Sequence, residues 1–321
     1  MSLRRSHHPA LYFIVLALVN LMWAFQFSGA RIAAAQLGPI MVSFLPMALA
    51  TILLFPLLFR EWRKSRALAR INRRDLRDFF LLGVLGVTPA QLGLTWGVQY
   101  APASNGAVLT LTIPILMVLL AALLLGERMT LLRWVSFVMA VGGVLLVSDI
   151  DWQSVDLVHR TYVLGNLLLL ASCAGSAFNN SFSKQVLERF SPVEVLVYTF
   201  LIADAILLVS MLFFESSSFA RLAFLDAAAW TSLLAIATLS LALSMVLFFW
   251  VIQRIDVTQA SLSIYLLPVF GVLISAVTLR EKLTARLVFG AVLVFASTFL
   301  VTTWEERRRA RKITISGEAS E

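Results

Sequence analysis

Ten long apolar stretches, separated by shorter polar connections, dominate the pattern of this chain. A helix needs about 20 mainly apolar residues to cross the roughly 30 Å hydrocarbon core of a bilayer, because its backbone polar groups must be satisfied within the segment. The pattern therefore predicts an all-α integral membrane protein with ten transmembrane helices. The predicted spans are residues 11–30, 39–59, 79–98, 104–125, 132–148, 162–182, 193–214, 230–252, 259–279 and 287–304.

The composition agrees with a chain that lies in lipid. Of the 321 residues, 60% are hydrophobic and only 14% are charged, and the mean hydropathy is +0.88, whereas soluble domains carry about 25% charged residues. The net charge of +8 does not indicate nucleic-acid binding, because the basic residues stand in short clusters between apolar stretches. We therefore expect the lipid bilayer, and no nucleic acid, as a partner.

The basic clusters also orient the chain. Lys and Arg concentrate on the cytoplasmic side of membrane proteins, and with the amino terminus inside, the predicted cytoplasmic segments hold about 20 of them against about six outside. Both termini of this multi-pass protein are thus predicted to be cytoplasmic. The preference for Arg over Lys is typical of high-GC bacteria, which favours the inner (plasma) membrane.

The chain contains an internal repeat. Residues 96–130 align without a gap on residues 250–284, which lie 154 positions later. About nine of these positions are identical, and they include Trp, Gln, Pro, Glu and Thr, which chance matching of apolar residues does not explain. A second register, offset by 153, pairs Phe25 with Phe178.

Each half holds five predicted helices, so the second half must enter the membrane in the opposite orientation. This is the inverted-repeat plan of secondary transporters, in which the substrate binds near the midplane between the repeats. We assign residues 1–150 to a first five-helix repeat, 151–304 to a second, inverted one and 305–321 to a basic and polar cytoplasmic tail. A central cavity is expected between the repeats.

Few residues could support catalysis or hold a metal ion. Cys173 is the single Cys, and the three His are His7, His8 and His159. The sequence contains no HExxH, GxSxG or Walker motif, so we expect no enzyme, no metal, no cofactor and no direct use of ATP. Cys173 itself is expected to be a small packing residue.

Two stretches carry a family resemblance: WGVQYAPASNGAVLTLTIPILMVLLAALLLGERMTLLRW at 96–134 and WVIQRIDVTQASLSIYLLPVFGVLISAVTLREKLTARLVFGAVLVF at 250–295. Small residues at a helix entry, a mid-helix Pro and a Gly-Glu-Arg-type end followed by Thr resemble the EamA-type repeat of the drug/metabolite transporter superfamily, over about residues 11 to 304. The resemblance implies a ten-helix inverted-repeat carrier, without a bound cofactor, that exports amino acids, other metabolites or toxic compounds. Departures at Leu45-Pro46 and Ala174 leave the substrate open.

In the transporters that this chain resembles, helices 1, 3, 4, 6, 8 and 9 line the cavity. A pathway for small amphiphilic substrates needs a few placed hydrogen-bonding groups and apolar faces. The candidate substrate-binding residues that these helices supply are Asn20, Trp23, Gln26, Gln91, Thr95, Trp96, Asn105, Thr110, Ser176, Asn179, Asn180, Ser244, Trp250, Ser261 and Tyr265. The amides are the stronger candidates, since a single Ser or Thr commonly bonds its own helix. Trp96 and Trp250 would alternatively belong to an interfacial belt.

Pro114 and Pro268 occupy equivalent positions in the two repeats. We expect them mid-membrane in helices 4 and 9, where each removes a backbone hydrogen bond and clashes with the carbonyl four residues earlier. The resulting kinks would serve as hinges or as static elements of packing.

Three acidic residues have candidate roles. Asp204 is the only one deep inside a predicted span, where a carboxylate costs about 2.5–3.5 kcal/mol on insertion scales, so it is a candidate for proton coupling. Alternatively, it stays protonated and bonds a neighbouring helix. Glu127 and Glu281 end helices 4 and 9 on opposite sides of the predicted membrane, as parts of hairpin turns or of a gating ion pair.

Together these observations predict a secondary transporter that exports a small organic metabolite, amino acids first, by alternating access of the two repeats. A lipid-linked metabolite flippase or a channel of the same architecture is the alternative. An intramembrane enzyme would need a catalytic constellation that the sequence does not offer. The sequence leaves open the substrate, the direction of transport, the energy coupling and a homodimer.

Overall fold

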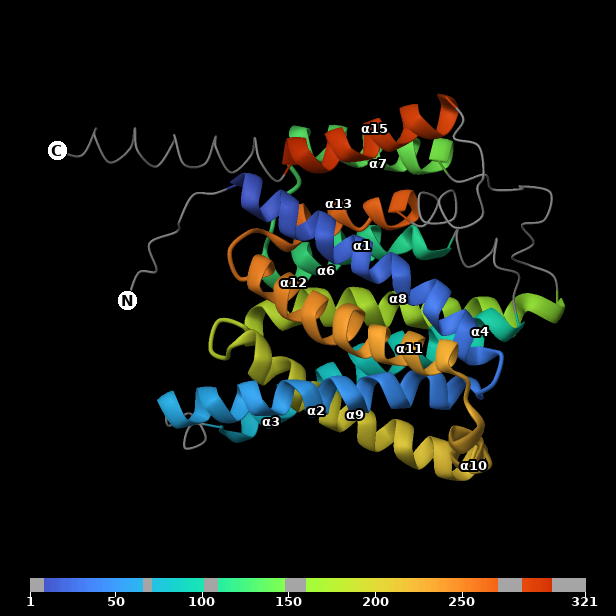
Figure 1. Cartoon of the computed structure of the whole chain (residues 1–321). Coiled ribbons are helices and arrows are strands. Elements are labelled where there is room, and N and C mark those ends of the chain that lie inside the picture. Colours follow the sequence, from blue (N-terminus) through green and yellow to red (C-terminus); the bar gives the residue numbers. More distant parts are fainter. Residues whose placement is uncertain (1–8, 66–70, 101–108, 148–159, 271–284, 302–321) are drawn as a thin grey trace.

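A computed structural model describes residues 9–65, 71–100, 109–147, 160–270 and 285–301 (Figure 1). No strand occurs in these ranges, so the expectation of an all-helical chain is confirmed for them. The elements are α1 (Pro9–Ala34), α2 (Pro39–Ser65), α3 (Arg73–Leu81), η2 (Leu82–Val87), α4 (Thr88–Tyr100), α6 (Thr112–Leu125), α7 (Leu131–Val147), α8 (Arg160–Val186), α9 (Pro192–Phe214), α10 (Ser218–Arg221), η3 (Leu222–Phe224), α11 (Ala227–Ala235), η4 (Ile236–Leu243), α12 (Ser244–Ile252), α13 (Val257–Ser263) and α15 (Ala285–Phe299).

Local capping signals explain where several helices begin. Asn72, Ser191 and Asp256 precede α3, α9 and α13, and each forms a capping box with the residue three positions later. Such side chains satisfy backbone N–H groups that have no partner within the first helical turn. The capping box at Asn72 starts the third helix several residues before the predicted span at 79–98.

Two of the helices are composite and contain π-helical turns. α3, η2 and α4 follow one another over residues 73–100, and α11, η4 and α12 over residues 227–252. The two composite helices begin 154 residues apart, and so do their π-helical turns, at Leu82 and Ile236. Since π-helical turns are rare and frequently lie at functional sites, their occurrence at equivalent positions is informative.

The helices pack in pairs that join the two halves of the chain. α2 packs against α9, α4 against α8, and α1 against α11, η4 and α12, while α7 and α15 lie side by side at one edge of the bundle (Figure 1). α6 contacts both α8 and α13. Most of the core is therefore built between the halves rather than within them.

Carboxylates at the ends of α2 and α9 strengthen one of these pairings. Glu215, directly after α9, accepts hydrogen bonds from the backbone N–H groups of Ile40 and Met41 at 3.0 and 3.1 Å, in the first turn of α2. Glu61 of α2 accepts a hydrogen bond from the Ser191 hydroxyl at the start of α9. Glu61 and Glu215 lie 154 residues apart, so carboxylates at equivalent positions bond the start of the facing helix, one through a Ser hydroxyl and the other through backbone N–H groups.

The outer faces of the bundle suit a lipid environment. Four helices, Pro39–Arg63, Arg73–Gly97, Pro192–Phe214 and Ala227–Ile252, are long and apolar enough to cross a membrane. Large apolar side chains are exposed on them and on their neighbours; Phe213, for example, is 80% exposed. The membrane character is thus supported, whereas the number of ten spans stays a prediction, because the other apolar helices of the described ranges are shorter than a full span or, like α8, carry many polar residues.

The predicted fourth and ninth helices are each interrupted a few residues before their proline. α6 begins only at Thr112, after a turn at Leu111, and α13 ends at Ser263, with residues 266–270 helical again after a turn. The turns lie three or four residues before Pro114 and Pro268, where a residue without an N–H group interrupts the helical hydrogen bonding, as the predicted kinks require. Their role as hinges stays a prediction.

Candidate functional site

The interruptions of the two helices meet inside the bundle. The turns lie at Leu111 and at Ile264–Tyr265, and the Tyr265 hydroxyl donates a hydrogen bond to the Leu111 carbonyl oxygen at 3.4 Å. Leu111 and Tyr265 are 154 residues apart, so the repeat brings equivalent breaks into contact. Irregular backbone at membrane depth is tolerated where it is buried in protein or lines a cavity.

A cavity of about 160 Å³ lies beside these breaks. Its polar lining side chains are Gln26, Gln91, Thr110, Ser172, Cys173, Ser176, Asn179, Asn180 and Ser240. Its aromatic and aliphatic lining residues are Trp23, Val87, Ala90, Leu94, Ile113, Leu169, Phe200, Leu241, Met245, Ile264 and Leu267. No charged side chain is among the described residues that line it.

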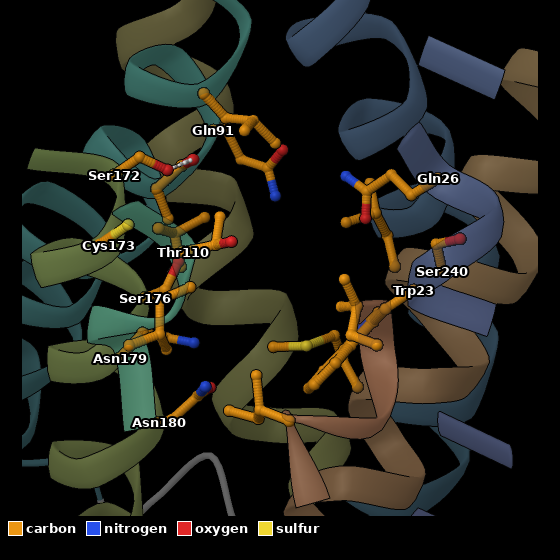
Figure 2. A pocket seen from close by; sticks show the side chains of 18 of the residues that line it. Trp23, Gln26, Gln91, Thr110, Ser172, Cys173, Ser176, Asn179, Asn180 and Ser240 are labelled. Atoms are coloured by element: carbon orange, nitrogen blue, oxygen red, sulfur yellow. Dashed lines mark hydrogen bonds between the residues drawn. The ribbon is translucent and has the colours of Figure 1, made fainter. Parts of the chain in front are cut away.

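The polar side chains gather on one wall. Figure 2 shows Gln91, Thr110, Ser172, Ser176, Asn179 and Asn180 together on one side, which α4, α8 and the segment before α6 supply. Gln26 and Trp23 of α1 face them from the opposite side. The cavity therefore has two chemically different walls.

Several amides on these walls make no side-chain hydrogen bond to the described residues. Ser172 and Ser240 use their hydroxyls structurally, donating at 2.7 Å to the carbonyl oxygens of Ala90 and Met22 in the neighbouring helices. Within the described ranges, in contrast, the side-chain amides of Gln26, Gln91 and Asn179 make no hydrogen bond.

Asn179 is the most telling of these amides. It is only 5% exposed, and its side chain points into the cavity (Figure 2). Its neighbour Asn180 has only a weak contact, at 3.8 Å, from its amide nitrogen to the Met117 sulfur. These amides can therefore exchange hydrogen bonds with a ligand or with water in the cavity.

Twelve of the twenty lining residues form six repeat-related pairs. The pairs at offset 154 are Val87 with Leu241, Gln91 with Met245, Thr110 with Ile264 and Ile113 with Leu267; those at offset 153 are Trp23 with Ser176 and Gln26 with Asn179. The two halves thus present the same positions to one cavity.

Seven of the fifteen predicted substrate-binding residues line this cavity: Trp23, Gln26, Gln91, Thr110, Ser176, Asn179 and Asn180. Asn105 lies outside the described residues. The other seven, which are Asn20, Thr95, Trp96, Ser244, Trp250, Ser261 and Tyr265, do not line it.

Most of the seven predicted residues that do not line the cavity form contacts within or between helices instead. Asn20 is fully buried, and its amide nitrogen donates to the Leu16 carbonyl oxygen at 2.7 Å and to Ser263 at 3.2 Å. The Thr95 hydroxyl lies 2.9 Å from that of Ser43 in α2. Ser244 and Ser261 donate to carbonyl oxygens of their own helices.

The aromatic outliers pack against other rings. Trp96 meets Phe214 with ring centroids 6.4 Å apart, and Trp250 meets Tyr12 at 5.8 Å. The Arg254 guanidinium also lies over the Trp250 ring, 4.1 Å from its centroid, as a cation–π contact.

Sequence reasoning missed Ser172, Cys173 and Ser240 as lining residues. Ser172 lies one helical turn before Ser176, so helical spacing alone could have found it. Ser240 lies in the π-helical turn η4, one helical turn before the predicted Ser244, and of these two serines only Ser240 is among the described lining residues. Cys173, expected as a packing residue, is indeed only 2% exposed, and it also lines the cavity.

Asp204 lies outside the cavity, at the contact between α9 and α2. One carboxylate oxygen accepts a hydrogen bond from the Thr51 hydroxyl at 2.7 Å, and the other makes none in the described ranges. Thr51 and Asp204 are 153 residues apart, so this bond joins equivalent positions of the two repeats. Phe200, one helical turn before Asp204, belongs to the cavity wall.

A buried charge cluster, formed by Glu127, Arg133, Lys184 and Asp256, joins four helices at one end of the bundle. The Glu127 carboxylate accepts hydrogen bonds from the backbone N–H groups of Val257 and Thr258, at 2.8 and 2.9 Å, at the start of α13. Lys184 at the end of α8 lies 3.5 Å from Glu127, and Arg133 of α7 pairs with Asp256.

This cluster adds contacts between helices to the predicted position of Glu127 in the turn between α6 and α7. The Arg133 side chain is 1% exposed and that of Glu127 is 7% exposed. A single carboxylate here links the end of α6 to the first turn of α13 through charge-assisted hydrogen bonds. Its repeat counterpart Glu281 lies outside the described residues.

Comparison with known protein families decides the identity. The model of the EamA-like transporter family matches residues 10–149 and again residues 163–303. The chain belongs to the EamA-like transporter family. The resemblance seen in the sequence is confirmed, and this EamA-type chain is a transporter rather than an enzyme.

Relatives extend over nearly the whole EamA-type chain. The uncharacterized transporter YoaV of Bacillus subtilis is 24% identical over 91% of this chain and 96% of its own length. A probable terminal-alkyne amino-acid exporter of Streptantibioticus cattleyicolor is 27% identical over 94% of this chain and 96% of its own. A protein of known crystal structure aligns with a TM-score of 0.75 at 17% identity, over 93% of this chain and 98% of its own, which shows a shared fold.

Proposed function

We propose that this EamA-type transporter is a secondary carrier that exports small organic metabolites, amino acids first, through the cavity between its two halves. The observation that carries the proposal is a set of three amides, Gln26, Gln91 and Asn179, which line a common cavity and make no side-chain hydrogen bond within the described ranges. These groups can donate to a carboxylate and accept from an ammonium group.

The size of the cavity supports a small substrate. Its volume of about 160 Å³ lies below the roughly 300–1,000 Å³ of pockets that hold drug-sized ligands. The name of the Streptantibioticus relative, a probable amino-acid exporter, points to the same class of substrate. The candidate binding residues are accordingly the seven predicted residues that line the cavity, together with Ser172, Cys173 and Ser240.

We infer that the halves, residues 1–150 and 151–304, are inverted repeats related by an approximate two-fold axis. Two repeat-equivalent pairs, Thr51 with Asp204 and Leu111 with Tyr265, are hydrogen-bonded to each other. Residues that touch their own equivalents must lie close to the axis that relates them. Alternating access would rock one repeat against the other about this axis, with the breaks at Pro114 and Pro268 as hinges.

In the orientation with cytoplasmic termini, the charge cluster of Glu127 lies at the cytoplasmic end. Lys184 follows Asn180 of the cavity wall by one helical turn, about 6 Å along α8. The cluster would therefore tie the cytoplasmic end together in this state and open in the other state. We further propose that the protein lies in the inner membrane of a bacterial cell, with its tail at residues 305–321 inside.

Asp204 is the proposed coupling residue. It is a carboxyl group at the contact of the two repeats, one helical turn from the cavity wall. An ionisable group within a membrane-spanning helix is by default a functional candidate.

The experiment is uptake of a labelled amino-acid panel into proteoliposomes, with and without a pH gradient, for the wild type, Asp204→Asn and Thr51→Val. We expect saturable flux, which a pH gradient drives in the wild type and in Thr51→Val but not in Asp204→Asn. Flux that responds to the gradient in all three proteins would remove Asp204 from coupling. No flux of any amino acid, with flux of a lipid-linked metabolite, would instead support a flippase.

A further inference from the structure

The repeat-related pairs in the cavity differ in polarity in a systematic way. Gln91 corresponds to Met245, and Thr110 corresponds to Ile264. Ser176 likewise corresponds to Trp23. In each of these three pairs one member is polar and the other is apolar.

The three polar members share one wall. Gln91 lies on α4 and Ser176 on α8, which pack against each other, and Thr110 lies directly before α6, which also packs on α8. Figure 2 shows these side chains on the same side of the cavity, together with Asn179 and Asn180.

The three apolar members share the opposite wall. Trp23 of α1 packs against Phe248 of α12 with ring centroids 5.2 Å apart, and Met245 is on the same helix as Phe248. Ile264 directly follows α13, which packs on α6 and also contacts α1 and α12. The duplicated positions have thus diverged into one polar and one apolar wall.

Another repeat-related pair has not diverged in polarity. Gln26 and Asn179 are both amides, so each wall keeps one group that can donate and accept a hydrogen bond. No described lining residue carries a charge, and a net charge moved from water into such a site would stay unpaired, which is strongly unfavourable.

We propose that the cavity selects net-neutral amphiphiles, such as zwitterionic amino acids with an apolar side chain, and holds them in one orientation. The polar groups of the solute lie against α4 and α8, and its apolar group lies against Trp23, Met245 and Ile264. This inference rests on the proposed function and deepens it.

The test exchanges residues within pairs, so that the cavity keeps its overall composition. Counterflow of leucine into proteoliposomes is measured for the wild type, for Gln91→Met with Met245→Gln, and for the control exchange Gln26→Asn with Asn179→Gln. The first exchange mixes the two walls, whereas the control leaves an amide on each. We expect the KM for leucine to rise about tenfold or more in the first exchange and to change less than about threefold in the control, as one lost interaction of ordinary strength predicts.

Competition on the wild type tests the charge requirement. Leucine counterflow should be inhibited by norleucine and phenylalanine and left unchanged by lysine and glutamate at the same concentration. Should the double exchange fail to fold, Met245→Gln against Met245→Leu decides, because only the glutamine variant should raise the KM.

Three results would contradict the account. A normal KM for leucine in the wall-mixing exchange, or equal inhibition by lysine and norleucine, would overturn the selection of oriented neutral amphiphiles while leaving the transporter function intact. Absence of any amino-acid flux in the wild type would overturn the proposed function and this inference with it.

Discussion

Two equivalent helix contacts flank the cavity, and they are built from different residues. The contact of η2 and α4 with α8 is rich in glycine: Gly86, Gly93 and Gly97 face α8, and Gly175 of α8 faces back. At the repeat-equivalent positions, the contact of η4 and α12 with α1 carries Ser240, Leu247, Val251 and Met22 instead.

The glycines let the first contact become unusually close. A Cβ atom on Gly93 would lie 2.5 Å from the Leu168 carbonyl oxygen, and one on Gly175 would lie 2.8 Å from that of Gly86. Gly93 and Gly97 therefore allow two helices of the same chain, α4 and α8, to pack closely together. The comparison teaches that one backbone plan, with a π-helical turn at the same place in each half, supports a tightly packed polar wall and a more loosely stacked apolar wall.

The largest effect is expected from a substitution in the charge cluster that ties the two walls of the cavity together. Glu127 joins Lys184 of α8 to the first turn of α13, and removal of one partner from a buried ion pair costs about 3–5 kcal/mol. In Glu127→Gln the end of the bundle that holds this cluster, which we propose is cytoplasmic, should open more often. Cys173, the single cysteine, lines the cavity and reports this as faster modification by a membrane-impermeant thiol reagent applied from the cytoplasmic side.

The control for that measurement is Glu188→Gln, which neutralises an exposed carboxylate in the turn just after α8. It should leave the labelling rate of Cys173 unchanged. Equal rates in Glu127→Gln and the wild type would show that the cluster does not close this end.

A smaller effect is expected from a methyl group in the close contact. Gly93→Ala must push α4 away from the α8 backbone, and such overpacking typically costs about 1–3 kcal/mol. Gly142→Ala in α7 meets nothing within 4 Å and should be neutral or stabilising, because Ala favours helix by about 1 kcal/mol. Thermal unfolding of the two variants in the same detergent measures the difference, and equal melting temperatures would refute the close contact.

The smallest losses of stability are expected from two serine substitutions, one at each of the two helix contacts, and these losses should be equal. Ser172 donates from α8 to α4 and Ser240 donates from η4 to α1, each at 2.7 Å. Loss of one such bond costs about 1 kcal/mol, so Ser172→Ala and Ser240→Ala should lower stability alike and additively in the double variant. A clearly larger loss of stability in one serine variant than in the other, measured by chemical unfolding in micelles, would show that the two helix contacts differ in more than their glycines.

The sequence predicted the helices better than it predicted which faces they turn inward. The apolar stretches located the helices because hydrocarbon thickness and backbone hydrogen bonding dictate their length. Pro114 and Pro268 predicted kinks, and the turns at Leu111 and Tyr265 lie just before them, but the sequence did not show that the helices are interrupted there, since proline suits both a kinked helix and the first turn of a new one. Regular helical spacing places Ser240 and Ser244 on one face, so the sequence could not show that Ser240 and not Ser244 lines the cavity.

The most direct test of the account compares two candidate residues with different surroundings. Counterflow of leucine into proteoliposomes is measured for the wild type, for Asn179→Leu, which removes a buried amide that bonds no other described side chain, and for Ser261→Ala, whose hydroxyl bonds the Thr258 carbonyl of its own helix away from the cavity. The account predicts saturable flux in the wild type and Ser261→Ala, and a loss of at least tenfold in Asn179→Leu. Equal flux in all three proteins, or an equal loss in both variants, would contradict it.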